Sequence, residues 1–204
     1  MDSSALLPPL NLQTSPSQLH QHLVHLRNHR NQSIHLCDQE IAFRNNTIKK
    51  RWDDVFEEYE DFTKTYTQFL REPLHQHLLR AGFFITINES LVGRRLTDPH
   101  PAHAWAAIIK RNPTGKGTTV IFWDPDALWR KTNLNPGYTG VTTRPQRNLV
   151  DELKKTRRVD ELWYGGHGNE AGEECVRLTM EFLADLMEKG LPDDLEEAGY
   201  TRYI

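Results

Sequence analysis

The sequence predicts an α+β fold: a small antiparallel or mixed sheet of about four strands with surrounding helices, preceded by an N-terminal helical arm with a long amphipathic helix. Two observations lead to this prediction. Apolar residues recur at helical spacing before about residue 80, whereas strand-like and helix-like segments alternate after it. In addition, two apolar runs at 103–110 and 118–124 flank a connection with Pro and Gly, which is typical of a β-hairpin. The predicted organisation is a flexible lead at 1–14, a helical arm at 15–80 and an α+β domain at 81–204.

Composition places the chain among soluble globular proteins. Its 204 residues are 37% hydrophobic and 26% charged, and the net charge of -3 gives no basic field that favours nucleic acid. No apolar run approaches the roughly 18 residues that a membrane span needs, and the N-terminal segment lacks the pattern of a signal peptide. Cys37 and Cys175 lie far apart and flank no metal pattern. We therefore expect reduced thiols in an intracellular protein, nuclear or cytoplasmic, with no membrane association.

The arm begins with a helix predicted over residues 16–30. Ser15 and Gln18 have the spacing of a capping box, and Pro16 stands at the first helical position. This helix carries several histidines, but no Cys or carboxylate accompanies them at metal-ligand spacing. No metal site is therefore expected there.

A second, long helix is predicted over residues 38–72. Its apolar positions alternate in steps of four and three residues, as in a heptad seam: Ile48, Trp52, Val55, Tyr59, Phe62, Tyr66 and Phe69. Aromatic residues are bulky for the seam of a dimeric coiled coil, so this helix is expected to pack on its own domain or on the first helix. Homodimerisation through residues 48–69 is the alternative.

The α+β part is predicted from four further patterns. A short helix starts at Pro73 and ends at Gly82, and a β-rich run follows at 83–87. After the hairpin, a helix is expected at 148–158 and a strand at 161–164. The last helix starts at Cys175, is amphipathic and ends at Gly190, and the tail adds one turn.

Cys175 is a candidate nucleophile because it stands at the predicted start of a helix. The N–H groups and the positive end of the dipole at such a position favour a thiolate. Glycines at 165, 166, 168 and 172 precede it and allow backbone shapes that a side chain would block. The plain alternative is a strand–loop–helix connection with a buried, inert Cys, which is also the expectation for Cys37.

His103 and Asp124 are expected to lie side by side, because the start of one hairpin arm pairs with the end of the other. A His next to an Asp is the pair of base and orienting carboxylate used in nucleophilic catalysis. Asp126 is an alternative orienting carboxylate, although its place after Pro125 favours a helix cap. His167 is a rival base, but a loop His so close in sequence to Cys175 is more often a surface residue.

The order His103, Asp124, Cys175, with these placements, resembles the adenain-like cysteine peptidases, the superfamily that holds the SUMO- and ubiquitin-like-protein-specific proteases. In that family a strand His precedes a Trp, an Asp ends the next strand, and a Gln stands six residues before a Cys that opens a helix. The corresponding segments here are HAW at 103–105, VIFWD at 120–124 and NEAGEEC at 169–175. The resemblance covers residues 83 to 187, about half of the chain.

This resemblance implies a thiol peptidase that cleaves a peptide or isopeptide bond with a Cys–His–Asp triad. Cys175 is then the nucleophile, His103 transfers the proton and Asp124 fixes the imidazole tautomer. Asn169, in the position of the family's Gln, and the N–H of Cys175 are expected to stabilise the oxyanion. No metal or organic cofactor is implied.

The resemblance also implies a substrate-binding cleft and a protein substrate of the ubiquitin-like class. Trp105 and Trp163 are expected to wall the cleft. The Gly-rich loop, which includes Gly166, is expected to let an extended Gly-containing tail pass through a narrow channel.

The chain departs from the family pattern, because the family's upstream substrate-binding Trp and Asp motifs are not evident and three further positions differ. Ala104 separates the His from the Trp, Asn169 replaces Gln, and Glu174 precedes the Cys where the family commonly has Asp. These departures favour a second hypothesis: a catalytically inactive peptidase-like fold that serves as a protein–protein interaction module through the long aromatic helix. A third is an unrelated α+β domain in which His103 and Asp124 are only hairpin ends.

Overall fold

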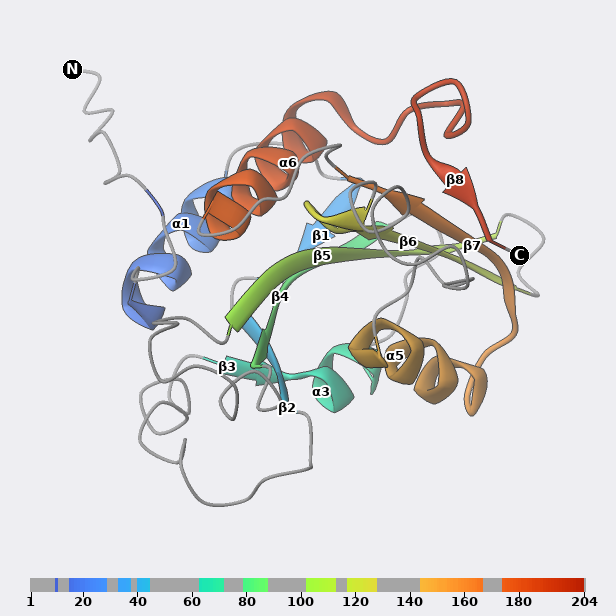
Figure 1. Ribbon diagram of the computed structural model, residues 1–204, viewed down its shortest axis with the longest axis horizontal. Helices are drawn as coiled ribbons and strands as arrows, with labels where there is room; N and C mark the ends of the chain where they lie inside the picture. The colour runs from blue at the N-terminus through green and yellow to red at the C-terminus, as the bar shows by residue number, and fades with distance from the viewer. Residues whose placement is uncertain are drawn as a thin grey trace.

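The computed structural model describes residues 10, 15–28, 33–37, 40–44, 63–71, 79–87, 102–112, 117–127, 144–166 and 174–203. These residues form a mixed sheet of eight strands with helices on both faces (Figure 1). The strands are β1 Ile34–Leu36, β2 Glu40–Arg44, β3 Thr63–Thr65, β4 Leu79–Ile87, β5 Ala102–Arg111, β6 Thr118–Trp123, β7 Val159–Gly165 and β8 Thr201–Arg202. The helices are α1 Pro16–Asn28, α3 Tyr66–Arg71, α5 Arg144–Lys154 and α6 Cys175–Lys189. The α+β class is confirmed, while the expected four strands become eight.

The strand order is β3-β2-β4-β5-β6-β7-β8, and β1 pairs with β4 beside β2. The pairs β4–β5, β5–β6 and β7–β8 are antiparallel, whereas β1–β4, β2–β4, β2–β3 and β6–β7 are parallel. The central β4–β5–β6 meander includes the two longest strands, β4 and β5. Its apolar run is buried on both faces, as the hairpin pattern predicts.

The two faces of the sheet carry separate apolar cores, because successive side chains of a strand point to opposite faces. One core joins α1 and α6 to Ala104, Ala106 and Ile108 of β5. The other joins α3 and α5 to Trp105, Ala107 and Ile109 of the same strand. Figure 1 shows this layering, with α1 and α6 on one side of the sheet and α3 and α5 on the other.

The first helix is confirmed, together with its capping box. The backbone N–H of Ser15 donates to Gln18 Oε1 at 3.0 Å, and the N–H of Gln18 donates to Ser15 Oγ at 3.4 Å. Leu19 and Leu23 bury the apolar side of α1 in the α6-side core. The flexible lead predicted at 1–14 lies outside the described residues, apart from Leu10.

The long helix predicted over 38–72 is wrong at residues 40–44 and 63–65. Of its described residues, 40–44 form β2 and 63–65 form β3, and only Tyr66–Arg71 is helical. Strand pairing decides here, because β2 lies in parallel register with β4, where Ile41 faces Phe84. The part of the heptad seam at 48–62 lies outside the described residues, and homodimerisation through 48–69 stays a prediction.

The predicted boundary near residue 80 falls inside β4. Because β1 and β2 pair with β4, strands from both sides of that boundary share one sheet. Gly82, expected to end a helix, lies within β4 instead, where its backbone passes close to the side chains of Ile41 and Phe69. The tail forms the predicted turn at 195–199 and then contributes β8 to the sheet.

No helix within the described part of the chain is both long enough and apolar enough to cross a membrane.

Candidate functional site

The two ends of the β5–β6 hairpin lie together, as predicted. The antiparallel register ends at Ala106 opposite Trp123, so His103 and Asp124 lie just beyond the last pair. His103 Nε2 lies 2.8 Å from Asp124 Oδ1. The His103 side chain is 22% exposed and the Asp124 side chain 1%, so the pair has a buried carboxylate and a partly accessible imidazole.

The carboxylate of Asp124 is held from three sides. Besides the contact with His103, Oδ1 accepts a hydrogen bond from the backbone N–H of Asp126 at 3.0 Å. Oδ2 accepts one from Gln146 Nε2 at 2.7 Å. Hydrogen bonds from N–H groups favour the ionised form of a buried carboxyl group, and they also fix its rotation. The arrangement therefore holds the carboxyl group at a fixed position beside the imidazole.

Asp126 is the second carboxylate near the imidazole. Its Oδ2 lies 3.8 Å from His103 Nδ1, so each ring nitrogen of His103 faces a carboxylate. Between the two candidates for the orienting role, Asp124 makes the hydrogen-bonded contact and Asp126 the longer one. Within the described residues, His103, Asp124 and Asp126 are the group whose side chains could hold a metal ion, with one ligand atom from each lying within 4.8 Å of the others.

Cys175 begins α6, as predicted, and it is fully buried. Its Sγ accepts a hydrogen bond from the backbone N–H of Ala104 at 3.5 Å. The pairing of β5 with β6 ends at Ala106, so no β6 carbonyl lies opposite the Ala104 N–H and the sulfur can accept from it. At this point the chain after β6 pairs with β7 instead, where the N–H of Asp124 donates to the carbonyl of Gly165. The thiol therefore lies at the end of the sheet that carries His103 and Asp124.

The thiol and the imidazole approach this sheet end from opposite faces. Ala104 belongs with Cys175 to the core on the α6 side, while Trp105 belongs to the core on the α5 side. By the alternation of the strand, His103 shares the face of Trp105, in agreement with the link from Asp124 to Gln146 on α5. By this alternation His103 belongs to the α5 side of β5, whereas Cys175 packs in the α6-side core.

Glu174, whose charge opposes a thiolate at Cys175, is an exposed residue that pairs with Arg177. Its Oε1 lies 3.1 Å from an Arg177 guanidinium nitrogen, and Glu181 binds the other nitrogen at 2.6 Å. The hydrogen bonds to Glu181 and then to Glu174 raise the pKa of Arg177. The Glu174 charge is therefore partly compensated at the start of α6.

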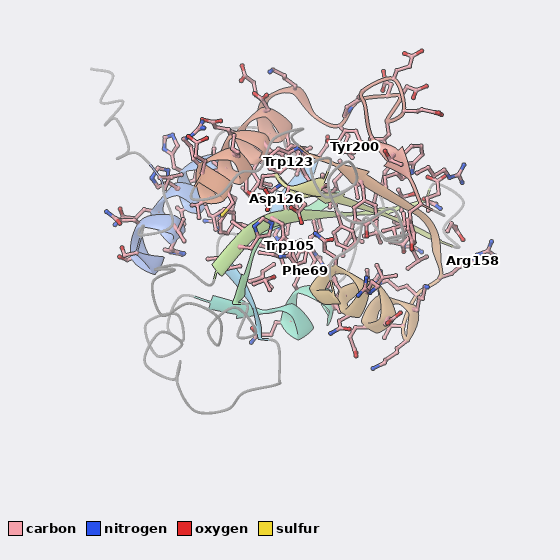
Figure 2. The ribbon with its side chains drawn as sticks, in the orientation of Figure 1. Phe69, Trp105, Trp123, Asp126, Arg158 and Tyr200 are labelled. Carbon is pink, nitrogen blue, oxygen red and sulfur yellow. The ribbon has the colours of Figure 1, made fainter. Side chains whose placement is uncertain are left out.

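The structure does not place Trp105 at a cleft wall. Trp105 is 1% exposed, stacks on Phe84 with 4.3 Å between ring centroids, and donates to Thr86 Oγ1 at 2.7 Å. Figure 2 shows Trp105 on the side of Phe69, whereas Trp123 lies beneath α6, where it stacks on Phe182. Trp105 is therefore a core residue of the opposite face from Cys175.

The other predicted substrate-binding residues lie along β7 and just after it. Trp163 is half-buried against the α6-side core, and the Arg202 guanidinium lies 5.8 Å from its ring centroid. Gly166 packs on the backbone of Asp124, because a Cβ there would lie 1.9 Å from the Asp124 carbonyl oxygen. Asn169, predicted for the oxyanion, and His167, the rival base, lie outside the described residues.

Gln146 is the site residue that the sequence analysis missed. It stands in the first turn of α5, which was predicted to start later, at 148. Its position four residues before Val150 and three before Leu149 places it on the apolar stripe of the helix. An amide on an otherwise apolar stripe is the one local signal that marks it.

Comparisons with known proteins add one structural similarity. No protein-family model matches the sequence, and the search of curated proteins found no match. The crystal structure of the effector protein RavZ of Legionella pneumophila is similar, with a TM-score of 0.47, 10% sequence identity and 92% of this chain covered. This chain spans 63% of the length of the RavZ chain.

Proposed function

We propose that this chain is a thiol peptidase in which Cys175 attacks a peptide or isopeptide bond, His103 transfers the proton and Asp124 orients the imidazole. The observation that carries the proposal is the 2.8 Å contact between His103 Nε2 and Asp124 Oδ1, at the same sheet end as a helix-opening cysteine. The order His103, Asp124, Cys175, which resembles the adenain-like peptidases, also supports it.

The proposed reaction needs one proton transfer in each direction. His103 accepts the thiol proton, and the Cys175 sulfur forms a bond to the carbonyl carbon. The imidazolium then gives that proton to the leaving amine as the C–N bond breaks, which leaves a thioester on Cys175. Water hydrolyses the thioester with His103 again as the base. Asp124 stabilises the imidazolium through both steps.

The substrate class follows from the resemblance and is part of the proposal. A protein with an extended Gly-containing tail, as in the ubiquitin-like class, would reach Cys175 along the loop that begins at Gly166. Asn169 and the backbone N–H of Cys175 would donate to the oxyanion.

The buried state of Cys175 means that the proposed reaction requires a rearrangement at the end of β5. The thiol is bound to the Ala104 N–H and lies among apolar residues of the α6-side core. In this proposal the hydrogen bond from the Ala104 N–H to the Cys175 sulfur opens before the thiol proton passes to the imidazole.

The same burial favours a second candidate, a peptidase-like fold without catalysis that acts as a protein-binding module. A thiol that is fully buried in an apolar core is the usual state of an inert cysteine. Of the long helix assigned to this function, residues 40–44 and 63–65 form strands and Tyr66–Arg71 is helical, while residues 48–62 lie outside the described part of the chain.

Alkylation of Cys175 by iodoacetamide separates the two candidates. The protein carries Cys37→Ser, so that only Cys175 reacts, and the rate is measured by mass spectrometry from pH 5.5 to 9. We expect His103→Ala to lower the rate at pH 6.5 by at least about tenfold, since the general base contributes factors of about 10² or more. His35→Ala, at an exposed position of β1, is the matched control.

The alternative outcome is equally informative. A rate that is the same in His103→Ala, His35→Ala and the parent at every pH means that the imidazole does not act on the thiol. The peptidase proposal would then be rejected in favour of the binding module.

A further inference from the structure

Gln146 is a buried polar side chain in an apolar setting. It is fully buried in the first turn of α5, one turn before Leu149 and Val150 and two turns before Leu153, which fill the α5-side core. Burying an amide without a hydrogen bond is costly, so its partner explains its presence. Its Nε2 donates to Asp124 Oδ2 at 2.7 Å.

The bond from Gln146 occupies the oxygen of Asp124 that His103 does not use. Oδ1 already serves His103 Nε2 and the N–H of Asp126, at 2.8 and 3.0 Å. Donors on both oxygens prevent the carboxylate from rotating about its Cβ–Cγ bond. Gln146 therefore determines which oxygen faces the imidazole and at what angle.

The helix that carries Gln146 adds an electrostatic contribution. Gln146 is the third residue of α5, so the carboxylate of Asp124 lies against the N-terminal turn of an 11-residue helix. The partial positive charge at this end of a helix stabilises an anion nearby. The amide and the helix end thus act on Asp124 in the same direction, toward an ionised carboxylate.

We infer that Gln146 is a positioning residue of the candidate active site, which holds Asp124 ionised and oriented toward His103. A contribution of Gln146 to catalysis rests on the proposed peptidase function, whereas its effect on the orientation of the His103 imidazole does not. Gln146 touches neither the thiol nor a substrate, and it acts through Asp124. Its carboxamide is the donor required here, because a carboxylate or an apolar side chain lacks the N–H.

Gln146→Glu tests this inference by replacing the donor with a group of the same shape that titrates. Two carboxyl groups 2.7 Å apart do not both ionise readily, so one proton is retained between them. While the introduced carboxyl group is protonated, it donates to Asp124 as the amide of Gln146 does. When the pair loses its proton, the like charges separate and the contact with His103 is disturbed. The titratable groups that face this position are His103 on β5, Asp124, and Asp126 in the turn after β6.

The matched control is Asn148→Asp. This substitution makes the same change of charge in the same helical turn, but two residues along an α-helix turn the side chain by about 200°, away from Asp124. Gln146→Leu is the second variant, which removes the donor at similar volume.

The first measurement is the NMR titration of the His103 ring with its tautomer, which requires no substrate. For Gln146→Glu we expect a second titration step and a change of tautomer above it, both absent from the parent and from Asn148→Asp. Below that step the parent spectrum should return, since the protonated carboxyl group of the variant restores the donor. A residue with a purely structural role would give a curve like that of Asn148→Asp, and this result would overturn the inference. If Gln146→Leu does not fold, Gln146→Glu alone decides, because its protonated form keeps the bond.

The second measurement is alkylation of Cys175 in the Cys37→Ser background. Gln146→Leu should lower the His103-dependent rate by about tenfold, the lower end of what loss of an outer hydrogen bond to a site residue costs. Gln146→Glu should match the parent at low pH and lose reactivity above the second step. If the parent rate does not depend on His103 but the His103 titration responds to Gln146→Glu, the peptidase proposal fails and the positioning of the imidazole stands. If the rate depends on His103 and neither variant changes it, the inference about Gln146 fails alone.

Discussion

The backbone N–H of Ala104 donates a hydrogen bond to the Sγ atom of Cys175 across 3.5 Å. This bond joins the first residue of α6 to the strand that carries His103. The bond forms beyond the last β5–β6 pair, where Asp124 already pairs with Gly165 of β7. The sulfur therefore accepts the hydrogen bond that a carbonyl of β6 would otherwise accept. The state of the thiol and the end of β5 are therefore coupled.

Because of this coupling, the amide of Ala104 should report on Cys175. Cys175→Ala removes the acceptor, and we expect hydrogen exchange at the Ala104 amide to accelerate about five- to tenfold, in line with the loss of about 1 kcal/mol from one hydrogen bond. The measurement is amide exchange by NMR, with Ala106, opposite Trp123 in the β5–β6 ladder, as the internal reference. Equal acceleration at both amides would indicate general loosening of the strand and would contradict a specific bond.

Asp124→Asn should destabilise the protein by about 1.5 to 3 kcal/mol, the usual contribution of hydrogen bonds to a buried charged group. Both carboxylate oxygens of Asp124 accept hydrogen bonds from N–H groups. An Asn side chain has an NH₂ group in place of one of these oxygens. This NH₂ group would face an N–H donor and could not accept from it. The free energy of unfolding in urea measures this cost. Asp126→Asn is the control, because its side chain is 18% exposed and its contact with His103 is 3.8 Å long. The three-donor description would be rejected by an Asp124→Asn cost no larger than that of the control.

The parts of the fold that were predicted correctly have strong local signals. The β5–β6 hairpin has two apolar arms, α1 has its capping box, and α6 has a continuous apolar face. The heptad spacing of aromatic residues predicts one long helix over 38–72, but this spacing carries no information on strand pairing. Two described parts of this segment, β2 and β3, are short strands. Tertiary contacts decide their pairing, β2 with β4 and β3 with β2.

The candidate site was predictable to the extent that it depends on register. The contact between His103 and Asp124 follows from hairpin geometry, and Cys175 was placed at its helix start. Gln146 was not predictable, because nothing local states that the first turn of α5 lies against Asp124. The place of His103 on the same face of β5 as Trp105 was predictable, since the side chains of a strand alternate between the two faces.

Gly166→Ala should cost about 2 to 3 kcal/mol, in the range of steric overpacking. The added Cβ would lie 1.9 Å from the carbonyl oxygen of Asp124, a backbone atom that cannot move aside as a side chain would. Moving it would strain the bond from the Asp124 N–H to the Gly165 carbonyl at 3.0 Å. Urea unfolding measures the cost, and the His103 ring signals should shift with it.

The matched control for this prediction is Gly199→Ala. Gly199 has open space around its Cβ position but a φ of +86°, so the substitution costs only the strain of a left-handed residue, about 1 kcal/mol. The close approach of Gly166 to Asp124 would be refuted if Gly199→Ala were the more destabilising of the two.

Stability should fall at alkaline pH because of Tyr200, whose ring covers Gly165 at the end of β7. Burial raises the pKa of Tyr200 from 10.0 to about 12, so the folded state keeps the phenol proton where the unfolded chain has lost it. Below pH 10 the phenol is protonated in both states and its contribution is complete. Between pH 10 and about 12 ionisation favours the unfolded chain, and we expect a loss of about 1 to 2 kcal/mol after allowing for partial solvent contact. Urea unfolding from pH 8 to 11.5 measures the slope, which Tyr200→Phe should reduce. Tyr203→Phe, at a ring that is 46% exposed, should leave it unchanged, and equal slopes in all three proteins would show that Tyr200 is not the responsible group.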